Sequence, residues 1–176
     1  NSPFSAAALG IQEFLNLSIP ASKLVLGVPW FGFDYTCDDG GSTPDMASPF
    51  CMMTPLVPFR GATCSDASGF EQAYVSVRNL LDSGPSATVG PRLWDNSTAT
   101  PFFNYLFKDG KRHQLWYDDP ESIRAKRHVA ESAGIAGFGV YEVSDLNYVV
   151  DQQGQLPKET TEMWNALQET NRTAAK

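Results

Sequence analysis

Four aromatic side chains lie within six residues of one another, around Gly32. They are Trp30, Phe31, Phe33 and Tyr35. They directly follow a short apolar run, residues 23–28, which is typical of a buried β-strand. Flat rings just beyond the end of a strand can stack on a ligand such as a sugar. The alternative is that the rings are ordinary core packing.

Three cysteines, Cys37, Cys51 and Cys64, lie in the next region, which is rich in Gly, Pro, Ser and Asp. Their spacings match no zinc pattern, so we expect no metal site. A disulfide that closes a loop of roughly 15 residues stabilises by about 3 kcal/mol in the chain-entropy model, so we expect one pair. Cys37 with Cys51 and Cys51 with Cys64 both give such a loop. Reduced thiols, as in a cytosolic protein, are the alternative.

Three Asn-x-Ser/Thr sequons begin at Asn16, Asn96 and Asn171. Together with the cysteines they predict glycosylation at these asparagines and a lysosomal or secreted location. The chain begins with Asn1, and no signal-like segment opens it. We therefore expect an internal piece or a processed product of a longer protein.

Composition indicates one ordinary folded core, with 42% hydrophobic residues in 176. The net charge of -7 and the absence of basic runs argue against nucleic acid or an anionic membrane as a partner. No cofactor motif occurs.

Hydrophobic periodicity predicts the elements that would position these residues. An amphipathic helix over 5–17, a turn and the strand over 23–28, ended by Pro29, form half of a βαβ unit. The first strand of that unit would precede Asn1. We expect the strand over 23–28 to be covered on both faces.

The middle of the chain reads as a small α+β insertion. Residues 36–69 are loop-rich, and a short helix follows over 71–81. Short strands are predicted over 92–95, 101–105 and 113–117, the last two joined by the turn at 108–110.

The alternation of helix and strand returns at Asp118. The run Asp118-Asp119-Pro120-Glu121 is typical of a helix start, and we expect its charges to serve the helix dipole, with a metal site as the weaker alternative. That helix should end near Gly134. A second buried strand is predicted over 135–143, with Tyr141 and Glu142 at its carboxyl end. A last helix buries a stripe of four residues, namely Thr160, Met163, Trp164 and Leu167.

These segments resemble the carboxy-terminal part of a glycosidase of glycoside hydrolase family 18. The resemblance rests on GVPWFGFDYTC, VPFRGA-x-CSDA, LWD, PFFNY, QLWYDDPESI and G-x-G-V-Y, in the family's order. It implies an α/β fold, the last portion of a (β/α)8 TIM barrel with a small α+β insertion between the last two strands. The implied parts are a barrel helix and penultimate strand (1–35), the insertion (36–117), a barrel helix with the last strand and last helix (118–170), and a tail (171–176).

The resemblance also implies that the catalytic acid lies outside this chain. The family's D-x-x-D-x-D-x-E motif, which supplies the acid, and its Met-x-Tyr-Asp run do not occur here. The family mechanism is substrate-assisted: the acetamido oxygen of the sugar attacks its own anomeric carbon while the Glu protonates the leaving oxygen. Glu142 is not expected to replace that acid, because the residue after Tyr141 on a strand points away from a pocket that Tyr141 faces.

Phe31, Phe33 and Tyr141 are the substrate-binding residues that the resemblance implies. The family usually has Trp in place of Tyr141 and often Tyr in place of Phe31. A smaller stacking area and a lost hydrogen bond, worth about 1 kcal/mol, would lower catalytic efficiency without abolishing sugar binding. Phe31 and Tyr141 should line one pocket, whereas Trp30 should face the other way and pack outward against the insertion.

Two functions stay open, and both take N-acetylglucosamine oligosaccharides as partners. A glycosidase would cleave GlcNAcβ1-4GlcNAc in N-linked glycans and chitin oligosaccharides by retaining hydrolysis, and would need the upstream barrel strands. A lectin of the same fold would bind chitin oligosaccharides without cleaving them. The upstream acid motif distinguishes the two.

Overall fold

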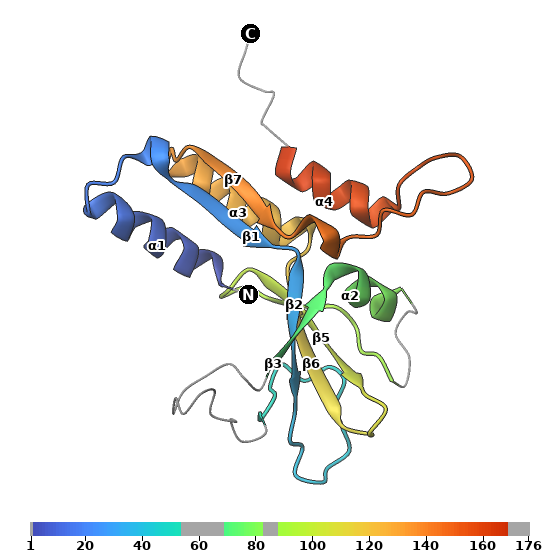
Figure 1. Cartoon of the computed structure of the whole chain (residues 1–176). Coiled ribbons are helices and arrows are strands. Elements are labelled where there is room, and N and C mark those ends of the chain that lie inside the picture. Colours follow the sequence, from blue (N-terminus) through green and yellow to red (C-terminus); the bar gives the residue numbers. More distant parts are fainter. Residues whose placement is uncertain (1, 54–68, 83–87, 169–176) are drawn as a thin grey trace.

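The structure is a computed structural model that describes residues 2–53, 69–82 and 88–168. Its elements form two parts, a pair of parallel strands with three helices and a five-stranded antiparallel sheet with one helix (Figure 1). The helices are α1 (Phe4–Asn16), α2 (Tyr74–Leu81), α3 (Pro120–Ser132) and α4 (Lys158–Gln168), with 3-10 turns η1 (Ala21–Lys23) and η2 (Val143–Asp145). The strands are β1 (Val25–Pro29), β2 (Phe31–Thr36), β3 (Gly69–Ala73), β4 (Leu93–Asp95), β5 (Thr100–Leu106), β6 (Arg112–Tyr117) and β7 (Gly137–Tyr141). Among the described residues, no helix has the length and apolar character to cross a membrane.

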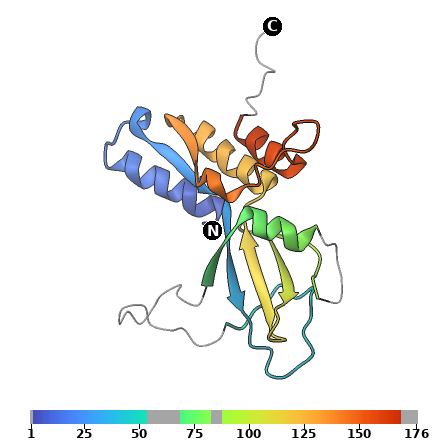
Figure 2. The ribbon, with the colours of Figure 1, turned by 45° about the vertical axis from the view of Figure 1, so that its right-hand side comes forward.

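The first part has the α/β arrangement that the sequence predicts. Strand β1 runs parallel to β7, with Val25 opposite Gly137 and Pro29 opposite Tyr141. Helix α3 packs on both strands and also contacts α1 and α4, so the three helices lie side by side (Figure 2). Two parallel strands with helices packed on them are the repeating unit of an α/β barrel.

Strand β1 is covered on one face among the described residues, whereas the sequence predicted cover on both. Leu26 and the buried Val28 belong to the core, but Val25, on the opposite face, is 63% exposed. The reason is that α3 covers one face, and the described residues pair β1 along one edge, with β7.

Pro29 does not end the ladder, contrary to expectation. Parallel strands direct the backbone groups of successive residues to alternate sides. The Trp30 N–H donates to the Tyr141 carbonyl at 2.9 Å, so the nitrogen of Pro29 lies on the side away from β7. A proline costs no hydrogen bond on the free edge of a strand.

The second part is a sheet with strand order β3-β2-β6-β5-β4. The three strands predicted over 92–117 are confirmed, but residues 31–36 form β2 and not the end of a barrel strand and a loop. The boundary expected at residue 35 therefore falls inside a strand of the insertion. Likewise, the helix expected from residue 71 begins at Tyr74, because residues 69–73 pair with β2.

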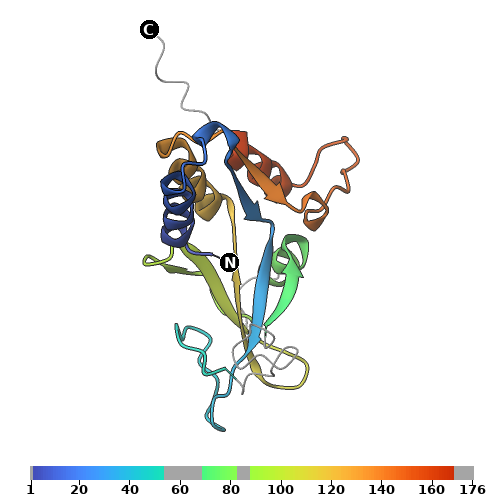
Figure 3. The ribbon, with the colours of Figure 1, turned by 60° about the vertical axis from the view of Figure 1, so that its left-hand side comes forward.

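The two faces of this sheet differ. On one face Phe103, Leu115 and Tyr117 are fully buried and cluster with Tyr74 and Val77 of α2. The other face looks toward the side on which α1 lies, and the segment that follows β2 lies on this side too (Figure 3). Helix α2 thus seals one face and leaves the other to the site described below.

Trp30 joins the two parts of the molecule. Its side chain is fully buried, as a structural residue should be, and it meets Trp164 of α4 edge-to-face with ring centroids 4.9 Å apart. The sequence predicted that Trp30 packs against the insertion. Trp30 does share a buried cluster with residues of the insertion, but its ring also contacts the last helix. The Trp30 carbonyl accepts the Tyr74 N–H at 3.1 Å, which fixes the start of α2.

The acidic run before α3 has two separate roles. Asp119 caps the helix as predicted, since its carboxylate accepts the N–H groups of Glu121 and Ser122. Asp118 instead forms a buried ion pair, because both of its oxygens accept from the Lys126 ammonium at 2.7–2.8 Å. This pair, which was not predicted from the sequence, ties the end of β6 to the middle of α3.

Candidate functional site

A hollow of about 740 Å³ opens between the start of α1, strand β1 and one face of β2. It is lined by Ser2, Pro3, Ala6, Ala7, residues 26–29, Phe31, Phe33, Tyr35, Lys126 and Tyr141. All three of the substrate-binding residues that the sequence singled out are in this set. Pockets of this size hold small molecules and are typically lined by apolar and aromatic side chains.

Three rings form a column along β2. Phe31, Phe33 and Tyr35 occupy every second position, and alternate side chains of a strand point to the same face. Their ring centroids are 5.7 Å apart between Phe31 and Phe33, and 6.4 Å apart between Phe33 and Tyr35. Gly69 on β3 makes room for the last ring, because a Cβ there would lie 2.7 Å from the Tyr35 ring. We call these three residues the aromatic column.

Tyr141 extends the aromatic column at its upper end. It is the last residue of β7, it is 64% exposed, and its ring meets Phe31 edge-to-face at 6.3 Å. Parallel strands β1 and β7 end at the same edge, and β2 continues directly from β1. The parallel pairing therefore brings together residues that are far apart in sequence, 31 and 141.

Another part of the hollow runs around the edge of β1 that pairs with no described strand. Its lining includes Leu26 and Val28 together with Gly27 and Pro29, and these two pairs lie on opposite faces of the strand. Lys126 also lines it, but its ammonium is already paired with Asp118. The ring-lined end is therefore the part suited to a ligand, because there the side chains converge from two strands.

Two carboxylates lie close to Tyr141 but do not line the hollow. Glu142 accepts a hydrogen bond from the Ser144 hydroxyl. Asp145 is largely buried, and this burial, together with the nearby charge of Glu142, raises the pKa of its carboxyl. None of the described residues that line the hollow carries a carboxylic acid that could protonate a leaving group.

The cysteines and sequons are only partly within the described residues. Cys37 and Cys51 form a disulfide, so one of the two pairings that the sequence left open is present. Cys64 and Asn171 lie outside the described residues. Asn16, at the end of α1, and Asn96, in the turn between β4 and β5, are exposed.

Tyr35 is the lining residue that the sequence analysis named without assigning it to the site. The missed signal is the alternation of aromatic with small or polar residues over 31–35, which has the period of a strand. Because the end of this segment was expected to be a loop, Phe31, Phe33 and Tyr35 were not predicted to share one face of a strand.

The chain is similar to known carbohydrate-active proteins. The family model described as "Glycosyl hydrolases family 18" matches residues 1–145. Human di-N-acetylchitobiase is 34% identical over 167 residues, which cover 95% of this chain and 40% of that protein. The chain thus spans about two fifths of the length of this relative.

Solved structures show the same fold at lower identity. A group IV chitinase of Ostrinia furnacalis, in complex with allosamidin, matches with a TM-score of 0.62 and 22% identity over 90% of this chain and 37% of its own. Human YKL-39, described as a pseudo-chitinase with retained chitooligosaccharide binding properties, matches with a TM-score of 0.58 and 16% identity over 90% of this chain and 39% of its own.

Proposed function

Because this chain belongs to glycosyl hydrolase family 18, we propose that it is the substrate-platform portion of a glycosidase that cleaves GlcNAcβ1-4GlcNAc. The proposed substrates are the chitobiose core of N-linked glycans and chitin oligosaccharides. The relatives are longer than this chain, so the activity is proposed for the full-length protein in which the remaining barrel strands are present.

The observation that carries this proposal is the meeting of Tyr141 and the aromatic column in one hollow. The C–H-rich faces of pyranose rings pack on aromatic rings, which gives affinity without demanding one hydrogen-bond pattern. The site lies where β1 and β7 end, and the carboxyl ends of the strands carry the active site in α/β barrels.

In the proposed mechanism this chain holds the sugar and another part of the protein supplies the acid. Tyr141 and Phe31 would fix the ring so that its acetamido oxygen can attack its own anomeric carbon, while a Glu from the rest of the barrel protonates the leaving oxygen. Water then opens the intermediate with net retention. Packing of the aromatic rings on the sugar would also exclude water from the reacting centre until that step.

A second function, a chitin-oligosaccharide-binding lectin, is favoured by one observation. None of the described residues that line the hollow carries a carboxylic acid, and a lectin needs only the binding surface. The similar fold of human YKL-39, a pseudo-chitinase by its description, adds to this case. Incubating the full-length protein with chitobiose and following release of N-acetylglucosamine separates the two functions, since a lectin releases none.

We expect the chain of residues 1–176 to be inactive by itself. The acid motif is absent from its sequence, and the described residues leave one edge and one face of β1 uncovered, which favours aggregation over ordered folding. A fluorogenic chitobioside assay on the expressed chain should therefore match a buffer blank. Clear turnover by the chain alone would show that an acid within these residues was overlooked.

We also propose a lysosomal or secreted location. The support is the Cys37–Cys51 disulfide together with the exposed sequon asparagines Asn16 and Asn96. Treatment of the protein from its native source with an N-glycosidase should shift its mass, and an unshifted mass would contradict glycosylation.

A further inference from the structure

The face of the sheet that carries the aromatic column becomes polar beside Tyr35, on the neighbouring strands β6 and β5. Gln114 on β6 stands directly opposite Tyr35, and Asn104 on β5 stands opposite Gln114. Arg112 follows two positions along β6, on the same face. Such amide and guanidinium groups could bind sugar hydroxyls, yet Asn104 is fully buried and the other two are 4% exposed. The polar row is therefore covered.

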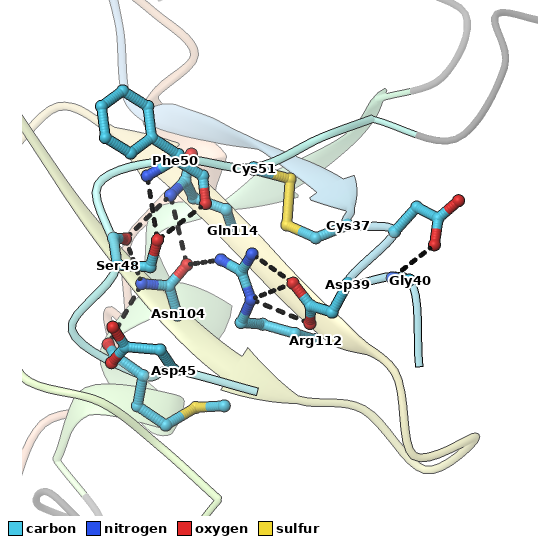
Figure 4. Close-up of polar contacts among 12 residues, drawn as sticks. Cys37, Asp39, Gly40, Asp45, Ser48, Phe50, Cys51, Asn104, Arg112 and Gln114 are labelled. Carbon is cyan, nitrogen blue, oxygen red and sulfur yellow. Dashed lines mark hydrogen bonds and ion pairs between the residues drawn. A yellow bond between two sulfur atoms is a disulfide. The ribbon is translucent and has the colours of Figure 1, made fainter. Parts of the chain in front are cut away.

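The cover is the segment 38–50, which we call the disulfide loop (Figure 4). The Asn104 side-chain amide donates to the backbone carbonyls of Met46 at 3.1 Å and Ser48 at 2.8 Å. The Gln114 amide donates to Asn104 Oδ1 at 3.2 Å, with the Ser48 carbonyl 3.4 Å away. The loop backbone thus lies directly over the row beside Tyr35.

Gly90 allows the disulfide loop to pack closely against the sheet next to β5. A Cβ at this position would lie 2.4 Å from the Met46 carbonyl oxygen, so any larger residue would push the loop away. The Gly90 N–H donates to the Asn104 backbone carbonyl at 2.8 Å, which places the loop, Gly90 and β5 in one packed layer. The cover is therefore built into the sheet.

Both ends of the disulfide loop are fixed as well. The Cys37–Cys51 disulfide closes its base. The buried Arg112 guanidinium pairs with the Asp39 carboxylate, with Nε to Oδ1 at 3.0 Å, and Nη1 donates to Asn104 Oδ1 at 2.9 Å. Lifting the loop would separate this ion pair and leave a buried cation without its partner, which is costly.

We propose that the disulfide loop is the wall that ends the sugar-binding track at Tyr35, and so limits the number of N-acetylglucosamine residues that the site accepts. The inference rests on the proposed function. Successive ring centroids lie 6.3, 5.7 and 6.4 Å apart from Tyr141 to Tyr35, so the four rings form a continuous apolar track. A sugar chain that lies along this track and extends past Tyr35 meets the disulfide loop, whose backbone is held over Gln114 and Asn104.

The test is to shorten the loop in the full-length protein. Replacing residues 42–49 by two glycines removes the carbonyls over the polar row but keeps Cys37, Cys51 and the partner of Arg112. Kd values are measured by calorimetry for sulfur-linked chitooligosaccharides of two, four and six units, which resist cleavage. In the unmodified protein, the six-unit ligand should bind no more than about twofold tighter than the four-unit ligand. In the shortened variant it should bind about tenfold tighter, because the uncovered amides of Gln114 and Asn104 gain sugar hydrogen bonds.

A matched control changes another exposed loop. Asp151 accepts the N–H groups of Gln153 and Gln155 in the loop between η2 and α4, which lines a separate hollow. Asp151→Ala should leave the dependence of Kd on ligand length unchanged. If melting shows that the shortened variant does not fold, Gly90→Ala takes its place with the same expected direction, because its Cβ would lie 2.4 Å from the Met46 carbonyl oxygen and would push the loop away while both amides remain.

The outcomes separate the two proposals. If a folded variant with the altered loop binds chitobiose and its Kd depends on ligand length as in the unmodified protein, the loop does not limit ligand length. That result would not affect the proposed glycosidase function. A six-unit ligand that already binds tenfold tighter than a four-unit ligand in the unmodified protein also overturns the wall. No binding of any oligosaccharide by the unmodified protein overturns the proposed function, and the wall with it.

Discussion

Replacing Asp118 with alanine lowers the free energy of unfolding of the full-length protein by about 3–5 kcal/mol, the cost of breaking a buried ion pair. Asp118 is fully buried, and its carboxylate accepts from Lys126 at 2.7 and 2.8 Å and from the Ser122 hydroxyl at 2.7 Å. Alanine leaves the Lys126 ammonium, 2% exposed, without its anionic partner. Urea unfolding followed by tryptophan fluorescence measures the change.

Two further variants test the reason for that loss. Asp82→Ala breaks the Arg78–Asp82 pair on the surface of α2, where Asp82 is 52% exposed, and should cost less than about 1 kcal/mol. The double variant Asp118→Leu with Lys126→Met removes both buried charges and should be more stable than Asp118→Ala. A double variant no more stable than Asp118→Ala would show that the lost hydrogen bonds, not the unpaired charge, carry the effect.

The position of this pair explains why it matters for the site. Asp118 follows β6 of the insertion directly, and Lys126 lies on α3, which packs on β1 and β7. The ion pair therefore holds the sheet that carries the aromatic column against the strands that carry Tyr141. A loss of stability here should be accompanied by weaker sugar binding even under conditions where the protein remains folded.

Tyr141→Ala in the full-length protein should weaken chitobiose binding tenfold or more. Loss of an aromatic ring that stacks on a ligand costs about 1–3 kcal/mol, by analogy with base stacking on proteins, and 1.4 kcal/mol corresponds to tenfold. Tyr141 is 64% exposed at the mouth of the hollow and meets Phe31 edge-to-face, so much of its surface is open to a sugar. Tyr141→Trp, with a larger face, should preserve or improve binding.

The matched control is Phe70→Ala. Phe70 on β3 is 63% exposed, almost the same as Tyr141, but it stands opposite Asp34 and so lies on the face of the sheet away from the aromatic column. Calorimetry with chitobiose should give an unchanged Kd for this variant, and thermal melting run alongside confirms that each variant is folded. If Tyr141→Ala binds as tightly as the unmodified protein, Tyr141 is a structural residue and the sugar platform is elsewhere.

Elements with strong local signals were predictable from the sequence. Helix α3 begins where Asp119 and Pro120 predict it, and it ends before Gly134, which has a φ of +63°. The turn at Gly110, with φ +79°, separates β5 from β6 as expected. In these cases the residue types at the ends of the element fix the backbone without help from distant parts of the chain.

The same holds for the identity of the candidate platform residues, but not for their arrangement. Phe31, Phe33 and Tyr141 were chosen from their place after apolar runs and from the family resemblance. Tyr35 was not assigned to the site, because residues 31–35 were interpreted as the end of a barrel strand and a loop, although their alternation has the period of a strand. The pairing of β2 with both β3 and β6 decided that residues 31–36 form a strand.

The sequence by itself determined the family, the α/β class, the main helices and the aromatic residues of the site, because these follow from local residue patterns and long shared motifs. The tertiary structure alone decided which ionic groups are buried together. Asp118 pairs with Lys126, and Asp39 pairs with Arg112, in each case after the chain has folded back on itself. Burial makes these partners obligatory, because an unpaired charge in the interior costs several kcal/mol, whereas in the unfolded chain water satisfies each group separately.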